Sequence, residues 1–447
     1  MTIKMKSKSF ESFFEVERLE KCYSEKIAKS MSSGIDNVTH EIFSQTLERE
    51  LTTINRKVLN DKYRFTNYKL KLISKGRGKI PREISIPTIR DRITLRCLCD
   101  YLLDTYKESI TQALPQQMIK DVISTIDDFD TFIKLDVKDF YPSIRHDILS
   151  SILETNIPKS ACRLIMAAVS TPTVSCAGGA STPSFIGVPQ GTSISNILAY
   201  IYLFDTDKKY HYQKTCKYFR YVDDILVLCQ HSDSHNIADS LKSDFVSLGL
   251  NTHEITTSSE KSKIGSTTEK LSYLGYELSY KNHKRIISSR KSSVDNLKNS
   301  LASIFTSYKY AKDKRIEYLN WRLHLRITGC IYEKQCKGWL FFFSEMNDFS
   351  QLYILDNYVK KLIARYKVPA SPPSFSKAIH EIKHNRYESK TIMNYDLFDV
   401  KDMRKFLIEV FGIKNIAAAR DSDIEALFHK KMRRETTDLL VDIQSFS

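Results

Sequence analysis

Two adjacent acids, Asp223 and Asp224, stand between two apolar runs that are each long enough to form a buried strand. This pattern predicts a β-hairpin that carries both acids at its turn. Crowding two carboxylates at such a place costs several kcal/mol unless a cation compensates, and a divalent metal ion does this well. The alternative interpretation is a solvated turn, because Asp is common in turns.

A third acid changes the balance between these interpretations. Residues 131–135 form another strand-like run that ends on Asp136. If this strand pairs with the hairpin, Asp136 and Asp223 converge. Three carboxylates at adjoining strand ends can hold two Mg²⁺ ions roughly 4 Å apart, the arrangement that activates an oxygen nucleophile and stabilises leaving pyrophosphate. That is the chemistry of nucleotide polymerisation.

The elements that must position these acids are mixed in type. Strand-like runs at 68–73 and 83–86 flank a basic turn, and helical periodicity follows from 88 to 106. Further strands are expected at 217–229 and 271–279. After residue 288 the pattern is mostly helical, with an irregular stretch near Cys330 and a Pro/Ser-rich linker at 368–374.

Composition indicates a folded protein with a polyanionic partner. The 447 residues include 68 basic and 53 acidic side chains, a net charge of +15, and such an excess favours nucleic acid. The nine cysteines contain no CxxC pair, so neither a disulfide framework nor a zinc ribbon is indicated, and a reducing cytoplasm is expected. The N-terminus has no secretory h-region, and prolines interrupt the long uncharged stretch 164–204, so no membrane partner is expected.

Three motifs resemble successive palm motifs of reverse transcriptases. They are the YVDD of residues 221–224, the DVKDFYPSI of 136–144 and the GVPQGTSISN of 187–196. GIDNVT at 34–39 and REISIPTIRDR at 82–92 are similar to N-terminal and fingers elements of group II intron and related bacterial enzymes. Tyr273-Leu274-Gly275-Tyr276 looks like their primer grip. The resemblance covers about residues 30–285.

This resemblance implies an α+β right-hand polymerase with fingers, a palm built on an antiparallel sheet, and a helical thumb. We expect the fingers with N-terminal helices at 1–95, the palm with part of the fingers at 96–285 and the thumb at 286–367. A C-terminal helical extension is expected at 374–447. The basic and aromatic residues of the thumb region suit the backbone of a template–primer duplex, with a basic surface over an ordinary core as the alternative.

The resemblance also implies the site residues. Asp136, Asp223 and Asp224, with Val137 beside them, would hold two Mg²⁺ ions, for which Mn²⁺ is a substitute. Tyr141 falls at the steric gate that excludes a 2′-hydroxyl, which implies dNTP substrates, and Lys261 loosely matches a lysine that protonates pyrophosphate. The remaining nucleotide-binding candidates are Lys75, Lys79, Arg82, Val137, Asp139, Phe140, Gln190 and Gly191. Among the cations, Arg82 is the firmer match, because a guanidinium binds phosphate oxygens bidentately. For Tyr141 the alternative is a core aromatic, and for Lys75 and Lys79 a solvated turn.

The sequence favours one kind of reverse transcriptase over others. No HNH-type endonuclease, cysteine-rich tail, integrase or RNase H segment is recognisable, and retron signatures are poor. The chain therefore looks like the defence-associated reverse transcriptases that act against phage in bacteria. Such relatives often copy a dedicated noncoding RNA, and some work as oligomers or with a second reverse transcriptase. A mobile retroelement or retron enzyme is the alternative; an RNA-dependent RNA polymerase is disfavoured because Tyr141 stands where such enzymes carry a second Asp.

One motif points to a different class of enzyme. His380-Glu381-Ile382-Lys383-His384 matches the HExxH pattern of zinc metalloproteases. The longer extension with a third histidine is missing, although Asp399 or Asp402 could supply a ligand. We expect a solvated or RNA-facing helix face instead, and keep a zinc metalloprotease as a remote alternative.

Overall fold

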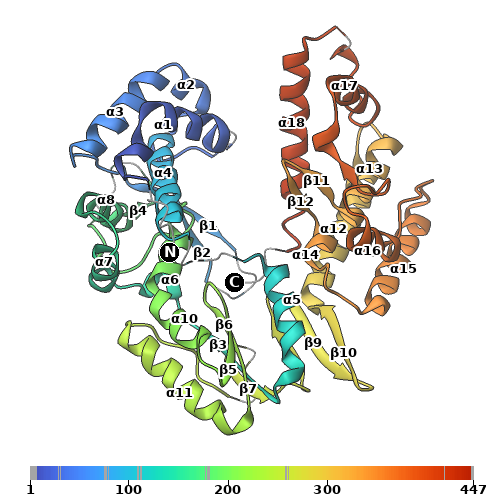
Figure 1. Cartoon of the computed structure of the whole chain (residues 1–447). Helices are drawn as coiled ribbons and strands as arrows, with labels where there is room; N and C mark the ends of the chain where they lie inside the picture. Colours follow the sequence, from blue (N-terminus) through green and yellow to red (C-terminus); the bar gives the residue numbers. More distant parts are fainter. Residues whose placement is uncertain are drawn as a thin grey trace, which may run out of the picture. The chain divides into compact units, whose positions relative to one another are not determined.

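The computed structural model describes residues 8–443 apart from 29, 31, 75–77, 79, 108, 109, 111, 112, 177, 179–181, 257, 258, 260 and 417. The chain divides into two compact units. Unit 1 comprises residues 1–112 and 131–265, and unit 2 comprises residues 113–130 and 266–447. Helices and sheets are mixed in both (Figure 1). Within the described residues, no helix is long and apolar enough to cross a membrane.

Unit 1 contains two sheets and most of the expected strands. Its strands are β1 (Tyr68–Ile73), β2 (Arg82–Ile86), β3 (Thr131–Asp136), β4 (Thr173–Val174), β5 (Cys216–Tyr221), β6 (Asp224–Cys229) and β7 (Lys263–Ser266). The orders are β2-β1-β4 and β5-β6-β3-β7. The predicted hairpin is confirmed, because β1 and β2 pair antiparallel with Lys69 opposite Ile86.

The helices of unit 1 surround these sheets. They are η1 (Glu11–Phe14), α1 (Val16–Cys22), η2 (Tyr23–Ile27), α2 (His40–Ser44), α3 (Leu47–Leu59), α4 (Ile89–Thr105), α6 (Phe140–Ser143), α7 (His146–Glu154), α8 (Lys159–Ser170), α9 (Ser195–Tyr202), α10 (Phe204–His211) and α11 (His231–Ser247). Helix α11 packs on β3, and α10 packs on β5 (Figure 1). One hydrophobic core runs through the unit.

The motif at 82–92 has a structural role that its chemistry explains. Thr88 caps the N-terminus of α4 by accepting a hydrogen bond from the backbone N–H of Asp91. The buried carboxylate of Asp91 in turn accepts hydrogen bonds from the hydroxyls of Tyr63, at 2.8 Å, and Thr88, at 2.8 Å, and from the backbone N–H of Thr66, at 3.1 Å. Because each donor belongs to a different part of the chain, Asp91 fixes where α4 begins.

Unit 2 is mostly helical with two small sheets. Its elements are α5 (Pro115–Thr125), η3 (Ile126–Asp128), β8 (Leu271–Tyr273), β9 (Tyr276–Lys281), β10 (Lys284–Ser289), α12 (Lys291–Tyr310), α13 (Ile316–Thr328), β11 (Cys330–Tyr332), β12 (Gln335–Lys337), α14 (Trp339–Phe342), α15 (Phe349–Tyr366), α16 (Phe375–His384), β13 (Met393–Asn394), η4 (Tyr395–Leu397), α17 (Val400–Glu409), η5 (Lys414–Ile416) and α18 (Asp421–Asp438). The sheet orders are β10-β9-β8 and β12-β11-β13.

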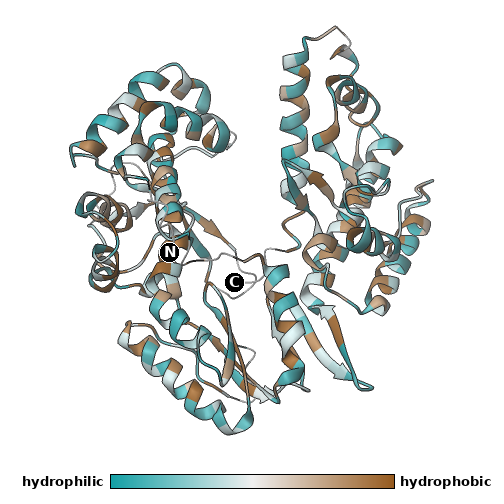
Figure 2. Cartoon of the chain, viewed as in Figure 1, coloured by the Kyte–Doolittle hydropathy of each residue, from teal (hydrophilic) through white to brown (hydrophobic). Residues whose placement is uncertain are grey.

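The C-terminal helices share a core with α13. Trp321 of α13 packs with Phe406 of α17 and Phe428 of α18 in one hydrophobic cluster. These helices carry hydrophilic and hydrophobic residues side by side, as expected for elements that bury one face (Figure 2).

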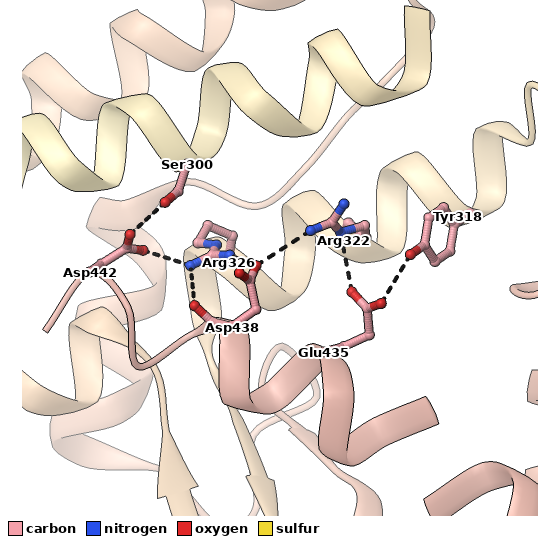
Figure 3. Close-up of polar contacts among 7 residues, drawn as sticks. All are labelled: Ser300, Tyr318, Arg322, Arg326, Glu435, Asp438 and Asp442. Carbon is pink, nitrogen blue, oxygen red and sulfur yellow. Dashed lines mark hydrogen bonds and ion pairs between the residues drawn. The ribbon is translucent and has the colours of Figure 1, made fainter. Parts of the chain in front are cut away.

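Buried ion pairs fasten α18 to α13. Arg326 donates to Asp442 at 2.7 Å and also pairs with Asp438, and Asp442 accepts from Ser300 at 2.5 Å (Figure 3). Arg322 pairs with Glu435 at 3.3 Å in the same network. The end of the described chain is therefore an integral part of unit 2.

Candidate active site

The three predicted acids lie at one end of the sheet that contains β3 and β6. These strands pair antiparallel, and the register places Asp136 directly opposite Asp224. Val222 and Asp223 form the turn between β5 and β6, and the backbone N–H of Val137 lies 3.4 Å from the carbonyl of Asp223. The predicted pairing of the two strands is confirmed, and it places residues 136, 223 and 224 at the same end of the sheet.

The electrostatics of Asp223 reflect this crowding. Burial, together with the negative charges of Asp136 and Asp224, raises the pKa of Asp223 to about 6. The positive charge of Arg82 acts in the opposite direction and lowers the pKa of the same carboxyl. A carboxyl whose charge is disfavoured by its neighbours is the kind of group that a cation stabilises.

Two lysines supply positive charge at the sheet end. The ammonium of Lys261 lies 3.0 Å from Oδ2 of Asp136, and the ammonium of the buried Lys134 lies 3.9 Å from Oδ1 of Asp224. Lys261 also lies 2.9 Å from Nε2 of His253, whose ring is 3.8 Å from Asp136. Burial lowers the pKa of His253, and the charge of Lys261 lowers it further.

Tyr141 lies beside the acids. Burial raises the pKa of Tyr141, and the charge of Asp223 raises it further, which places the phenol within electrostatic reach of that carboxylate. Its hydroxyl donates to Oδ1 of Asn196 at 2.6 Å. The carbonyl of Tyr141 accepts the backbone N–H of Val188 at 2.8 Å, so the GVPQG segment is held directly against the aromatic residue.

The GVPQG segment also contacts strand β2. The carbonyl of Gln190 accepts the backbone N–H of Ser85 at 2.7 Å. Gly191 has φ +95°, and a Cβ there would stand 2.6 Å from a methyl group of Ile84, so only glycine fits this approach. Arg82, at the start of β2, lies within electrostatic reach of Tyr141 and Asp223, because its charge lowers the pKa of both groups. The predicted candidates Lys75 and Lys79 lie outside the described residues.

The residues between Asp136 and Tyr141 are mainly structural in their contacts. Val137 is buried and bridges to Thr252, and Asp139 adopts φ +43° before α6. Phe140 is only 2% exposed and packs in the core of unit 1. Any contact of Phe140 with a nucleotide would therefore involve its main chain.

Comparison with known proteins indicates the protein family that the segment carrying these site residues resembles. Residues 73–278, just under half of the chain, match the family described as "Reverse transcriptase (RNA-dependent DNA polymerase)". Residues 73–278 form a reverse transcriptase domain. Proteins of this family are described as RNA-dependent DNA polymerases, which are nucleotidyltransferases that act on a nucleic-acid template, a primer and dNTPs.

Other comparisons add little to this class. A search of curated proteins found no match. Among solved structures, the chain is similar to an apo telomerase from Candida tropicalis truncated from its C-terminal domain, at 15% identity and a TM-score of 0.38. That match covers 56% of this chain and 60% of the telomerase chain. The chain therefore spans less than two thirds of the telomerase chain.

Reverse transcriptase domains use divalent metal ions, and the donor set here suits such an ion. Carboxylate oxygens are hard ligands, and the raised pKa of Asp223 marks a place where added positive charge is favourable. Within the described residues, however, no three His, Cys, Asp or Glu side chains are grouped so that they could hold an ion together. Lys261 and Lys134 lie against two of the carboxylates instead, so an ion that binds Asp136 must compete with the ammonium of Lys261.

The primer-grip residues predicted beside the reverse transcriptase motifs lie in unit 2. Tyr273 ends β8, Leu274 and Gly275 form the turn, and Tyr276 begins β9. Both tyrosines are buried: Tyr273 donates to the sulfur of Met118 at 3.2 Å, and Tyr276 donates to the carbonyl of Phe342 at 2.5 Å. Their side chains therefore hold the β8–β9 turn, and their contacts are made within unit 2.

The HExxH residues lie on α16 in unit 2. The rings of His380 and His384 are 4.7 Å apart, one helical turn from each other, and both are exposed. Neither Asp399 nor Asp402 completes a three-residue metal cluster with them within the described residues. Asp399 caps α17, where it and Asp402 form a capping box.

Sequence reasoning missed three residues of the site. His253 and Lys134 approach the acids, and Asn196 fixes Tyr141. The sequence could have identified Lys134, since alternation along a strand puts residues 134 and 136 on one face. The sequence could not have identified His253, because this residue reaches Asp136 through a loop contact. In that contact the backbone N–H of His253 donates to the backbone carbonyl of Asp136 at 2.9 Å.

Proposed function

We propose that the whole protein is an RNA-directed DNA polymerase that joins dNTPs to a 3′ or protein hydroxyl by two-metal phosphoryl transfer. The observation that carries the proposal is the strand register that sets Asp136 opposite Asp224, with Asp223 at the adjoining turn. The reverse transcriptase domain of residues 73–278 supports the reaction class.

In this proposal Asp136, Asp223 and Asp224, with the carbonyl of Val137, hold two Mg²⁺ ions. When bound, the ions supply activation of the attacking hydroxyl and stabilisation of charge on the departing pyrophosphate. The ring of Tyr141 occupies the space that a 2′-hydroxyl would need. Lys261 holds a proton on Nζ beside Asp136, where it is available to the leaving pyrophosphate.

The fingers and the GVPQG segment bind the triphosphate and base in this proposal. Arg82 brings a guanidinium into electrostatic reach of Asp223 and Tyr141, which suits the phosphates of an incoming nucleotide. Gln190 and Gly191 line the nucleotide pocket next to Arg82. Lys75 and Lys79, which lie outside the described residues, add positive charge for the phosphates. Tyr273 to Tyr276 act as the primer grip.

We further propose that the template is a dedicated noncoding RNA and that the enzyme works in bacterial antiphage defence, in the cytoplasm. A homo-oligomer or a second reverse transcriptase is the expected protein partner. This part rests on the resemblance of the motifs at 34–39, 82–92, 136–144 and 221–224 to bacterial enzymes, and the net charge of +15 supports the nucleic-acid partner.

The test begins with the nucleic acid that copurifies with the full chain, sequenced before and after addition of dNTPs and Mg²⁺. The expected result is new DNA complementary to one RNA species, absent for Asp223→Asn. Incorporation of labelled dNTPs in preference to ribonucleotides is expected from the same preparation. RNA products would instead indicate an RNA polymerase, and equal incorporation by Asp223→Asn would refute the assigned metal site.

A further inference from the structure

A buried guanidinium supports the turn that carries Asp223. The side chain of Arg220, on β5, reaches the end of its own strand, and its Nη1 donates to the carbonyl of Val222 at 2.8 Å. The residue is 5% exposed. It therefore contacts the turn from the protein interior.

The turn needs such support because its backbone is strained. Val222 has φ +60°, a region that is unfavourable for a β-branched residue. Its carbonyl belongs to the peptide group that leads directly into Asp223. The orientation of this peptide group sets the direction in which the carboxylate of Asp223 leaves the backbone.

Arg220 is itself held in place by several groups. Its Nε donates to Oδ1 of Asp207 on α10 at 2.7 Å, and its Nη2 pairs with Oδ2 of the same carboxylate. The ring of Tyr200 on α9 lies 4.8 Å from the guanidinium carbon, in cation–π geometry. The hydroxyl of Tyr218 donates to Oδ1 of Asp207 at 2.9 Å. One carboxylate thus binds the guanidinium bidentately, and a further N–H of the guanidinium donates to the turn.

A second contact fixes the other end of the turn. The carbonyl of Asp223 faces the backbone N–H of Val137 at 3.4 Å, next to Asp136. The peptide groups on both sides of Asp223 are therefore anchored, one by the neighbouring strand and one by Arg220. Removing the bond to Val222 would leave the strained turn attached on one side only.

We propose that Arg220, oriented by Asp207, is a positioning residue that sets the carboxylate of Asp223 in its metal-binding direction. It acts through the Val222 carbonyl and touches neither substrate nor metal. This inference rests on the proposed function for its kinetic consequences, but its effect on metal affinity is measurable without nucleotide.

The decisive variant is Arg220→Lys in the full chain. A lysine keeps the charge that pairs with Asp207, but a single ammonium cannot form the bidentate pair and also reach the Val222 carbonyl. We expect Arg220→Lys to remain folded by circular dichroism. Mn²⁺ binding, measured by electron paramagnetic resonance without nucleotide, should weaken about tenfold. The kcat for dNTP incorporation should fall about 10- to 100-fold, while the KM for dNTP changes little.

Two control variants separate positioning from general stability. Tyr218→Phe removes one donor to Asp207 but leaves the hydrogen bonds of Arg220 to Asp207 and to Val222, so Mn²⁺ affinity and kcat should stay near the wild-type values. Arg326→Gln removes a similarly buried arginine in unit 2 (Figure 3). It should lower stability without changing the Mn²⁺ affinity of the folded fraction.

The outcomes distinguish this inference from the proposed function. Wild-type Mn²⁺ affinity and kcat in folded Arg220→Lys would overturn the positioning role. If the wild type binds Mn²⁺ but incorporates no nucleotide, the proposed function fails, and the Mn²⁺ affinities alone then decide the inference. If Arg220→Lys weakens Mn²⁺ binding no more than Tyr218→Phe does, the turn does not depend on Arg220.

Discussion

The ammonium of Lys261 lies 3.0 Å from Oδ2 of Asp136, the carboxylate that also faces Asp224 across the β3–β6 pair. Lys134 stands 3.9 Å from Asp224. Positive charge is therefore already present beside two of the three acids. Asp223 is different, because its pKa is raised to about 6 by burial and by the charges of its neighbours.

This difference predicts the stability of an Asp223→Asn variant without metal. Because the folded pKa of Asp223 exceeds its unfolded value, the folded chain keeps this proton to higher pH, and the contribution of Asp223 to stability falls as the pH rises from about 4 to 6. In EDTA at pH 7, Asp223→Asn should be more stable than the wild type by about 1–3 kcal/mol. Circular dichroism melts across this pH range measure the difference.

The control for this prediction is Asp239→Asn, which removes an exposed carboxylate from α11. Its stability should follow the wild-type pH profile. An Asp223→Asn variant no more stable than the wild type at pH 7 in EDTA would contradict the crowding of the three acids. Added Mg²⁺ should stabilise the wild type more than the variant, since ligand binding to the folded state raises stability.

The contacts of Tyr141 predict a split between two substitutions. Tyr141→Phe keeps the ring and loses only the hydrogen bond to Asn196. It should therefore retain sugar discrimination and lose about 1 kcal/mol of stability. Tyr141→Ala removes the ring, and its preference for dNTPs over ribonucleotides should drop about 10- to 100-fold. Competition between labelled dGTP and GTP measures this preference. Equal discrimination by both variants would mean that the ring of Tyr141 does not exclude ribonucleotides.

The arrangement of the acids could be predicted from sequence because it depends on local patterns. Apolar runs of similar length lead up to Asp136 and away from Asp224, and strands of such runs pair with their ends aligned. The position of Arg220 shows where that reasoning stops. Its partner Asp207 lies on a different element, and no periodicity links a strand residue to an acid on α10.

For the same reason, the sequence could not predict which segments of the chain form unit 2. Residues 113–130 join it through non-local contacts, such as the ion pair of Asp127 with Arg285 at 2.5 Å. The stretch near Cys330 contains β11, which gains a parallel partner from β13 some sixty residues later. Such pairings depend on tertiary packing, which overrides local propensity.

Close packing of the GVPQG segment predicts a large effect of Gly191→Ala. The new Cβ would meet Ile84 at 2.6 Å, in a backbone conformation with φ +95°. The backbone conformation alone costs about 1–2 kcal/mol, and overpacking adds about 1–3 kcal/mol. Gly178→Ala is the matched control, since its φ is +79° but no atom of the described residues lies within 4 Å of the added Cβ. Circular dichroism melts should show the larger loss for Gly191→Ala, with loss of dNTP incorporation; equal losses would argue against the close approach of β2.

The ion pairs at the C-terminal end predict that Asp442 stabilises unit 2. Asp442→Ala leaves Arg326 with Asp438 as its remaining acid and removes the acceptor of Ser300 (Figure 3). Breaking one side of a buried pair costs about 3–5 kcal/mol, and the surviving pair with Asp438 favours the lower value. Both tryptophans of the chain, Trp321 and Trp339, are buried in unit 2, so their fluorescence in urea follows this unit specifically.

The control for Asp442→Ala is Asp423→Ala, which breaks the exposed pair with Arg420 at 3.1 Å on α18. A surface pair contributes about 0–1 kcal/mol, so its urea midpoint should stay near that of the wild type. The contrast isolates burial, because both variants remove one carboxylate paired with an arginine near the same helix. Similar midpoints for the two variants would mean that the network in Figure 3 does not hold the end of α18 against α13.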